Sequence, residues 1–315
     1  MTEIKIPMSV PSKKRDEYLK NYRQLTNGSG RLLLIAGDQK VEHLNDDFFG
    51  RGIASDDENP EHLFKIAAGS QGGVLATHLG LISRYGRNYQ SLPYIVKLNG
   101  KTNLGAVEKD SSKLWWKVED VVKFKEQSGL KIVGIGYTIY LGGGYEAKML
   151  SKAARAIYQA HQAGLTAIIW MYPRGKDIKE ENIHTIAGGA GVAAALDADF
   201  VKVKYPYGLK DQKAAALAFQ EAVKAAGRTK VICVGGDKRP VPQLLDVLAK
   251  QVNISGTSGL ATGRNLHQRP LDEAIRLARA MGDIVFRKET AKAAGLTYQK
   301  KLSIPAKRGG FLGLF

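Results

Sequence analysis

Two lysines lie two residues apart in an apolar stretch of this chain. Lys202 and Lys204 belong to the segment Phe200–Tyr205, whose other members are Phe, Val and Tyr and which is predicted to form a buried strand. Because side chains alternate along a strand, both lysines are expected to face the same side. Burying an ammonium group is costly unless its charge is paired or lost. The pair therefore requires a chemical explanation.

A lysine amine attacks a carbonyl carbon only in its neutral form. With an ordinary pKa of about 10.4, little of the amine is neutral at pH 7. Burial and a second cation both lower that pKa. Lys97 lies in another apolar run, Tyr94–Asn99, and is expected to add to the effect. The pattern predicts either an imine with a ketone or aldehyde, or binding of a phosphate or carboxylate by the lysines, and the residues alone do not decide.

Short apolar, β-branched runs that could position these lysines recur along the chain and are predicted to be strands. Because they are apolar throughout rather than alternating, they indicate a parallel sheet that is buried on both faces. The eight runs are Arg31–Gly37, Gly73–His78, Tyr94–Asn99, Ile132–Tyr137, Ala167–Tyr172, Phe200–Tyr205, Lys230–Gly235 and Gly259–Gly263.

Amphipathic helices are predicted between the strands, and Gly164 and Gly227 are placed to end two of them. Eight strand–helix units predict an α/β fold, a (β/α)8 TIM barrel over residues 31–285, with an N-terminal extension at 1–30 and a basic C-terminal tail at 286–315. A doubly wound sheet is the alternative, but no GxGxxG follows the first run. The clearest helical segments are Tyr145–Ala163, Asn182–Leu196, Asp211–Ala226 and Pro240–Lys250.

In such a barrel the chemistry lies at the carboxyl ends of the strands. The first strand leads to Asp38, which could be a helix cap or a catalytic carboxylate. The fifth ends with Trp170 and Tyr172 on one face, followed by Arg174. After the seventh and eighth, glycines allow backbone N–H groups to approach an anion, and an arginine adds further donors. These predicted phosphate contacts are Gly235, Gly236, Gly263 and Arg264.

Composition narrows the classes of function. The formal net charge is +17, but the visible basic clusters lie in probable tails and are not interleaved with aromatic residues, so nucleic-acid binding is not favoured. The chain has no apolar run of about 18 residues and no secretory pattern at its start, so we expect a cytoplasmic protein without a membrane span.

Cysteine and histidine chemistry is also disfavoured. The single cysteine, Cys233, lies in an apolar run and is predicted to be a buried structural thiol. The six histidines show no HxH or HExxH spacing, so no metal site is predicted. A Ser–His–Asp arrangement has no GxSxG motif from which to start.

Five segments in order give a more specific indication. The chain reads "VGIGYTIYLGGGYEAKM", "WMYPRG", "ADFVKVKY", "VGGDK" and "TGRNLHQR" between about Arg31 and Met281. This series resembles the archaeal-type class I fructose-bisphosphate aldolases, a branch of the Schiff-base aldolase barrels that is related to deoxyribose-phosphate aldolase. The resemblance covers most of the chain.

The resemblance implies roles for particular residues. In that family an Ala-Asp pair and two further residues precede the imine-forming lysine, which corresponds here to Lys202, with Lys204 as its inward neighbour. Tyr172 corresponds to the general acid and base, and Asp38 to the carboxylate that binds substrate hydroxyls and assists proton transfer. The substrate contacts implied in addition are Gln39, His43, Asp47, Trp170 and, for a phosphate, Arg174.

The activity implied is cleavage of fructose 1,6-bisphosphate to dihydroxyacetone phosphate and glyceraldehyde 3-phosphate, without a metal or organic cofactor and in a homo-oligomer. Two departures leave the sugar phosphate undecided: Asp-Gln-Lys at 38–40 replaces Asp-His-Gly, and Gly-Gly-Asp-Lys at 235–238 replaces Gly-Gly-Pro-Lys. The alternatives are a sister Schiff-base aldolase or transferase, such as the enzyme that makes an aromatic amino-acid precursor, and a sugar-phosphate-binding barrel without catalysis.

Overall fold

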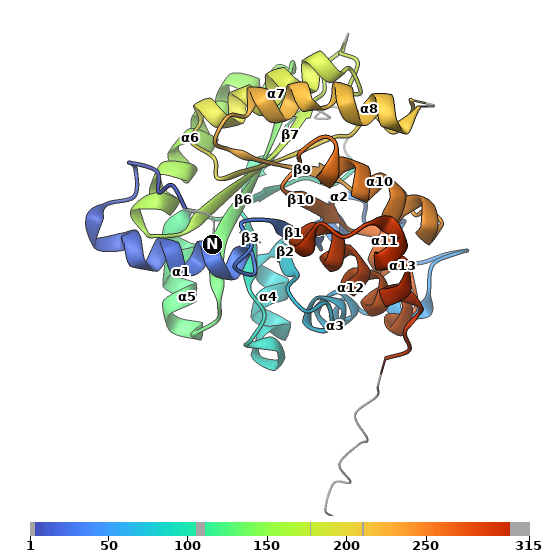
Figure 1. The fold of residues 1–315 in the computed structure, drawn as a ribbon. Helices are drawn as coiled ribbons and strands as arrows, with labels where there is room; N and C mark the ends of the chain where they lie inside the picture. Colours follow the sequence, from blue (N-terminus) through green and yellow to red (C-terminus); the bar gives the residue numbers. More distant parts are fainter. Residues whose placement is uncertain (1–3, 105–110, 177, 210, 303–315) are drawn as a thin grey trace, which may run out of the picture.

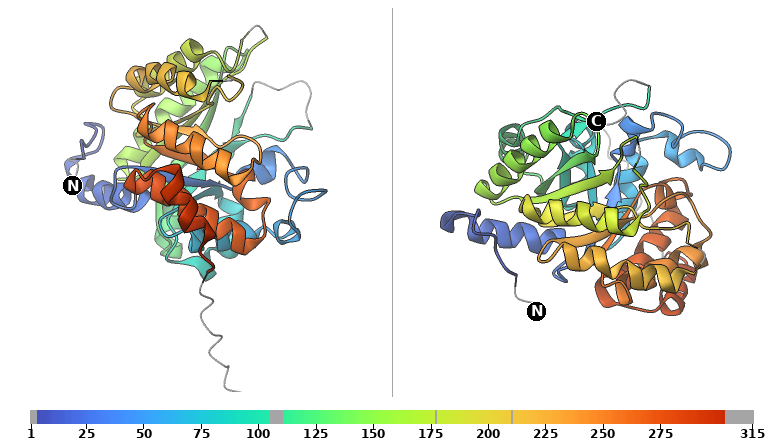
Figure 2. Two further views of the ribbon diagram at one scale, coloured as in Figure 1. Left: turned by 45° about the vertical axis from the view of Figure 1, so that its right-hand side comes forward. Right: turned by 90° about the horizontal axis from the view of Figure 1, so that it is seen from above.

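The computed structural model describes residues 4–104, 111–176, 178–209 and 211–302. Eight parallel strands close into a barrel in the order β1-β10-β9-β8-β7-β6-β3-β2, and helices surround it (Figures 1 and 2). This confirms the predicted (β/α)8 TIM barrel. A separate two-stranded ribbon is formed by β4 (Asn99–Gly100) and β5 (Lys113–Leu114).

Each of the eight predicted runs contains a barrel strand. Most boundaries agree within one or two residues, but β6 continues four residues beyond its predicted end, because it pairs with β7 as far as Leu141 and Pro173. The strands are β1 (Leu32–Ala36), β2 (Val74–His78), β3 (Tyr94–Lys97), β6 (Ile132–Leu141), β7 (Thr166–Pro173), β8 (Phe200–Val203), β9 (Lys230–Val234) and β10 (Gly259–Thr262).

The predicted helices are also present, with one difference. The segment predicted as one helix, Asp211–Ala226, is divided at Phe219 into α8 (Gln212–Ala218) and α9 (Gln220–Ala225). The other helices are α1 (Arg15–Leu25), α2 (Gln39–Glu42), α3 (Glu61–Gly69), α4 (Leu79–Tyr85), α5 (Val118–Ser128), α6 (Glu146–Gln162), α7 (Ile183–Ala195), α10 (Val241–Asn253), α11 (Arg264–His267), α12 (Leu271–Arg287) and α13 (Ala291–Gln299).

Alternation along the strands divides the buried residues into two clusters. One lies inside the barrel and includes Leu34, Ile95, Ile168 and Phe200, while the other lies between the strands and the surrounding helices. Cys233 belongs to the outer cluster, and burial raises its pKa, as expected for a structural thiol.

The N-terminal extension closes one end of the barrel. Tyr18, Tyr22 and Leu25 of α1 are buried with the interior cluster, and the side-chain amide of Asn21 donates to the carbonyl of Gly164, just before β7. The left view of Figure 2 shows α1 on the side of the molecule opposite to the segment that follows β1. The basic stretch around α1 is therefore a packed helix and not a tail.

A buried polar cluster fixes this extension to the barrel. His161 lies 2.7 Å from the hydroxyl of Ser9 and 3.1 Å from the carboxylate of Asp199, which also accepts a hydrogen bond from Tyr18. Burial alone would lower the pKa of His161, but Asp197 and Asp199 raise it to about 9. The histidine is therefore held in its charged form at neutral pH.

The C-terminal segment also differs from a simple tail. Within residues 286–315, Ala291–Gln299 forms α13, which packs on α12. The hydroxyl of Thr297 lies 2.5 Å from the carboxylate of Asp283, and a guanidinium nitrogen of Arg276 lies 2.7 Å from the carbonyl of Tyr298. Residues 303–315 of the predicted tail lie outside the described part of the chain.

Candidate active site

Lys202 lies inside the barrel near the carboxyl end of β8. It follows the interior residue Phe200 by two positions, so strand alternation directs it inward, and only 5% of it is exposed. Its register partner on β7 is Trp170, and the ammonium nitrogen lies 5.2 Å from the centroid of that ring. The predicted nucleophile is thus buried against an aromatic surface.

Lys97 approaches the same place from β3. It follows the interior residue Ile95 by two positions, is fully buried, and places its nitrogen 5.1 Å from the centroid of the Trp170 ring. The nitrogen also lies 3.5 Å from Oδ2 of Asp38 and 4.0 Å from Oε1 of Glu42. Two lysines and two carboxylates therefore meet at one end of the barrel.

The charges of this group shift each other's ionisation. Burial lowers the pKa of Lys202, Asp38 opposes the shift, and Lys97 adds to it. Burial alone would raise the pKa of Asp38, but Lys202 and Lys97 hold it below its usual range. Burial and Lys97 therefore increase the share of neutral amine at Lys202, while Lys97, 3.5 Å from Asp38, remains as a cationic partner for that carboxylate.

Lys204 does not lie where the alternation predicted it. β8 ends at Val203, so the pleat no longer governs Lys204, and its side chain is 35% exposed. Its nitrogen lies 3.0 Å from a carboxylate oxygen of Glu180 and 3.5 Å from one of Glu181. The prediction that Lys204 is the inward cation beside Lys202 is wrong, and Lys97 occupies that role.

Tyr172 and Arg174 extend the site along β7. Tyr172 stacks on Tyr140 with ring centroids 6.2 Å apart, and the guanidinium of Arg174 lies over both rings. Burial, together with the charges of Glu42 and Asp38, raises the pKa of Tyr172 well above its usual value. Nε of Arg174 donates to Glu180 at 2.8 Å, so this cation is already paired.

The predicted phosphate loops adjoin each other but are not equally available. The N–H of Gly235 donates to the carbonyl of Ala261 at 2.7 Å, so the expectation that it binds phosphate is wrong. Gly236 has a φ of +69°, which glycine adopts without strain. Gly263 lies against Gln39, since a β-carbon added there would come 1.9 Å from Oε1 of Gln39.

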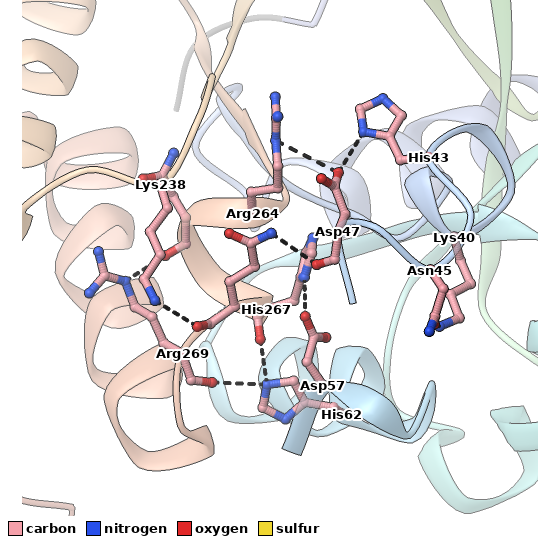
Figure 3. A network of polar contacts seen from close by, with 12 residues as sticks. Lys40, His43, Asn45, Asp47, Asp57, His62, Lys238, Arg264, His267 and Arg269 are labelled. Carbon is pink, nitrogen blue, oxygen red and sulfur yellow. Dashed lines mark hydrogen bonds and ion pairs between the residues drawn. The ribbon is translucent and has the colours of Figure 1, made fainter. Parts of the chain in front are cut away.

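Arg264 lies between two carboxylates at this rim. One guanidinium nitrogen is 2.6 Å from Asp237, and Nε is 3.8 Å from Asp47, which itself lies 2.5 Å from Nδ1 of His43 (Figure 3). The hydrogen bond to Asp47 raises the pKa of His43 despite its burial. The structure thus brings His43, Asp47 and Arg264 together on one side of the barrel mouth.

Several buried polar atoms at this end have no hydrogen-bond partner within the described part of the chain. Such atoms in a folded protein mark places where a ligand or water binds. They include Oδ1 of Asp38, Oε1 of Gln39 and Nε1 of Trp170. Their position around Lys202 and Gly263 supports a polar ligand in the barrel mouth.

Sequence reasoning gave no role to three residues of this site. Lys97 was expected to join the lysine pair as a further cation, but nothing in the sequence connected it to Asp38. Glu42, Tyr140 and Glu180 received no role, because their importance arises from contacts between different elements. Among the described residues, no group of three or more His, Cys, Asp or Glu side chains is arranged to hold a metal ion. None of the helices in the described ranges has the length and apolarity to cross a membrane.

Comparisons with known proteins agree with this geometry. Residues 32–269 match the model of the DeoC/LacD family aldolases. A relative from Methanocaldococcus jannaschii, named fructose-bisphosphate aldolase/6-deoxy-5-ketofructose 1-phosphate synthase, is 54% identical over 89% of each chain. A class 1 fructose-bisphosphate aldolase from Thermoproteus tenax is 34% identical over 82% of this chain and 90% of its own.

Solved structures give the same result. A fructose-bisphosphate aldolase from Slackia heliotrinireducens superposes with a TM-score of 0.91 at 44% identity and 96% coverage of each chain. An archaeal fructose-1,6-bisphosphate aldolase, with its catalytic lysine covalently bound to the carbinolamine intermediate, superposes with a TM-score of 0.72 at 31% identity, covering 85% of this chain and 99% of its own.

Proposed function

Because this chain belongs to the DeoC/LacD family of aldolases, we propose that it is a class I aldolase whose Lys202 forms an imine with a phosphorylated ketose. The main substrate proposed is fructose 1,6-bisphosphate, cleaved to dihydroxyacetone phosphate and glyceraldehyde 3-phosphate. The observation that carries the proposal is the buried Lys202, whose pKa is lowered by burial and by Lys97. Relatives at 54% and 34% identity carry the name of this enzyme.

The imine step uses the neutral amine of Lys202. Its nitrogen attacks the ketone carbon and forms a carbinolamine, which then loses its hydroxyl as water and leaves a protonated imine. Tyr172, whose raised pKa keeps the phenol protonated, is suited to give the proton that the departing water requires. The protonated imine draws electrons from the neighbouring carbon–carbon bond.

Cleavage then proceeds by transfer of the proton from the substrate's C4 hydroxyl. Asp38 stays ionised because Lys202 and Lys97 lower its pKa, and its Oδ1 is without a partner in the described chain, so it is suited to accept this proton. The electrons of the C3–C4 bond pass to the imine to give an enamine, and the aldehyde leaves. Protonation of the enamine at C3 and hydrolysis release the second product and regenerate Lys202.

The phosphate contacts proposed lie on two sides of the mouth. We propose that Gly236, Gly263 and Arg264 hold one phosphate, since Arg264 is the first residue of α11 and follows β10 after Gly263. Gln39, His43 and Asp47 adjoin this loop through Arg264 and Gly263. Arg174, which lies over the rings of Tyr140 and Tyr172, is proposed to contact the other end of the substrate.

A second candidate reaction is favoured by the state of Arg174. Glu180 pairs with both Arg174 and Lys204, and Glu181 pairs with Lys204, so two carboxylates offset the two cations at that end, which favours a ketose with a phosphate at one end only. The Methanocaldococcus jannaschii relative is also named a 6-deoxy-5-ketofructose 1-phosphate synthase. Comparing kcat/KM for bisphosphate and monophosphate ketoses separates the two, and the same panel tests a sister aldolase or transferase.

Borohydride trapping tests the proposal directly. Reduction in the presence of dihydroxyacetone phosphate should add the mass of the reduced adduct to the peptide that contains Lys202, and EDTA should leave cleavage unchanged. Lys202→Met should abolish both the adduct and cleavage, whereas Lys204→Met, the matched change two residues away, should keep the adduct. An adduct on Lys204, or none with the unmodified protein, would overturn the assignment.

We also propose, from the family resemblance, that the enzyme acts as a cytoplasmic homo-oligomer in sugar-phosphate metabolism, in glycolysis and gluconeogenesis. Light scattering coupled to gel filtration measures the oligomeric state. A monomer at micromolar concentration would contradict this part of the proposal.

A further inference from the structure

A segment of the barrel mouth is held against the loops that follow β9 and β10. Residues 43–58, called here the strap, leave α2 and end with the short 3-10 helix Ser55–Glu58. Figure 3 shows side chains of the strap directed toward Arg264 and His267 of α11. Segments about 200 residues apart in the sequence therefore form one network.

The centre of this network is a buried pair. Nδ1 of His267 lies 2.6 Å from Oδ2 of Asp57, and the side chains are 0% and 1% exposed. Phe48 stacks on the His267 ring, with centroids 4.6 Å apart and planes 7° apart. His62 contacts the carbonyls of His267 and Arg269 at 3.0 and 3.1 Å. Removing either member of such a buried pair is costly, because the other is left without a partner and away from water.

Further contacts fix the backbone of the strap on the same loops. The ammonium of Lys238 donates to the carbonyls of Gly52 and Gln268 at 2.8 and 2.9 Å. The side-chain amide of Gln268 donates to the carbonyl of Asp47 at 2.9 Å. The backbone of Asp47 is therefore tied to the residue that directly follows His267.

This attachment determines where the Asp47 carboxylate lies. From its fixed backbone, Asp47 reaches His43 at 2.5 Å and Nε of Arg264 at 3.8 Å. The opposite side of the guanidinium is paired with Asp237, which is largely exposed. Asp47 is the more buried of the two carboxylates, and its charge faces Nε of Arg264, a nitrogen that has no hydrogen-bond partner in the described part of the chain.

We propose that Asp57 and His267 are positioning residues for phosphate recognition. They hold the strap on α11, so that Asp47 orients Arg264 toward the phosphate of the substrate. The inference rests on the proposed function, in which Arg264 binds phosphate and Lys202 forms the imine. It assigns the strap to binding and leaves the imine chemistry to the barrel interior.

Asp57→Ala and His267→Phe test whether this pair positions Arg264. His267→Phe keeps an aromatic ring against Phe48 but removes the hydrogen bond to Asp57. Both should raise the KM for the phosphorylated ketose, and the inhibition constant of inorganic phosphate, by about tenfold or more, as loss of a fixed geometry does. The kcat at saturation should change by less than about twofold. Borohydride trapping with dihydroxyacetone, which has no phosphate, should be unchanged.

Two further variants make the outcome decisive. Asp57→Asn keeps an acceptor for His267, so its KM and its inhibition constant for phosphate should lie close to those of the unmodified protein. Glu58→Gln removes a neighbouring exposed charge and should change neither. If Asp57→Ala and His267→Phe lower kcat in proportion to the folded fraction while KM and phosphate inhibition stay constant, the pair is structural only and the inference is overturned. Failure of the proposed function would appear separately, as absence of the Lys202 adduct in the unmodified protein.

Discussion

Lys97 and Lys202, from β3 and β8, both place their ammonium nitrogens over the ring of Trp170, 5.1 and 5.2 Å from its centroid. The second cation near the proposed nucleophile therefore comes from across the barrel. An aromatic face tolerates a cation, but its surroundings are poor in water, so the two lysines oppose each other's charge.

Lys97→Met should raise the pKa of Lys202, because it removes a positive charge and leaves Asp38 free to stabilise the ammonium form. A larger share of Lys202 is then protonated at neutral pH, so the acidic limb of the kcat/KM profile should move to higher pH. Lys204→Met, which lacks this proximity, should leave the limb in place. A limb that moves to lower pH would contradict the assignment of Lys97.

Tyr172→Phe should lower kcat for cleavage by about 10²- to 10⁴-fold, the usual contribution of general acid–base catalysis. The raised pKa of Tyr172 keeps the phenol protonated, so the variant loses a proton donor at the imine. The adduct on Lys202 should still be trapped, but more slowly. Tyr158→Phe, on an exposed position of α6, is the matched control. Unchanged cleavage by Tyr172→Phe would remove this tyrosine from the mechanism.

Gly263→Ala should raise the KM for a phosphorylated ketose by about tenfold, because overpacking a fitted contact costs about 1–3 kcal/mol. The added β-carbon would lie 1.9 Å from Oε1 of Gln39, so one of the two must move. Gly188→Ala on α7 meets nothing within 4 Å and should leave KM unchanged. If Gly263→Ala has the same KM as Gly188→Ala, the contact between Gly263 and Gln39 does not affect substrate binding.

His161→Gln should remove a pH-dependent part of the stability. The pKa of His161 is raised from 6.5 to about 9, so its stabilisation is complete below pH 6.5 and is lost as pH rises through about 9. The fall in Tm between about pH 6 and pH 9.5 should therefore be smaller in the variant than in the unmodified protein. His184→Gln, at an exposed position, should retain the full fall. An unchanged pH dependence in His161→Gln would contradict the charged form.

The barrel could be predicted because its strands are buried on both faces. All five residues of β1 and of β2 are buried, so the sequence shows continuous apolar runs there. The role of α1 could not be predicted in the same way, because lysines and arginines surround its buried Tyr18 and Tyr22. Those aromatic residues find their partners only in the interior of the closed barrel.

The site residues could be predicted within the strands but not beyond the point where each strand ends. Alternation correctly directed Lys202 and Trp170 inward, but it was extended one residue too far at Lys204, where β8 has already ended. The pairing of Arg174 with Glu180 and of Arg264 with Asp237 depends on the path of loops. The path of a loop has no periodic pattern in the sequence, so these two ion pairs could not be predicted.

The seam between β1 and β10 joins Leu32 to Gly259, so the ring of strands is completed only by residues near the end of the chain. During synthesis α1 emerges early, yet the interior that it covers is assembled only when β6, β7 and finally β10 have been made. Contacts of such large sequence separation slow folding and leave apolar surface exposed in the meantime. The apolar face of α1 is therefore expected to stay incompletely covered until β10 has been made.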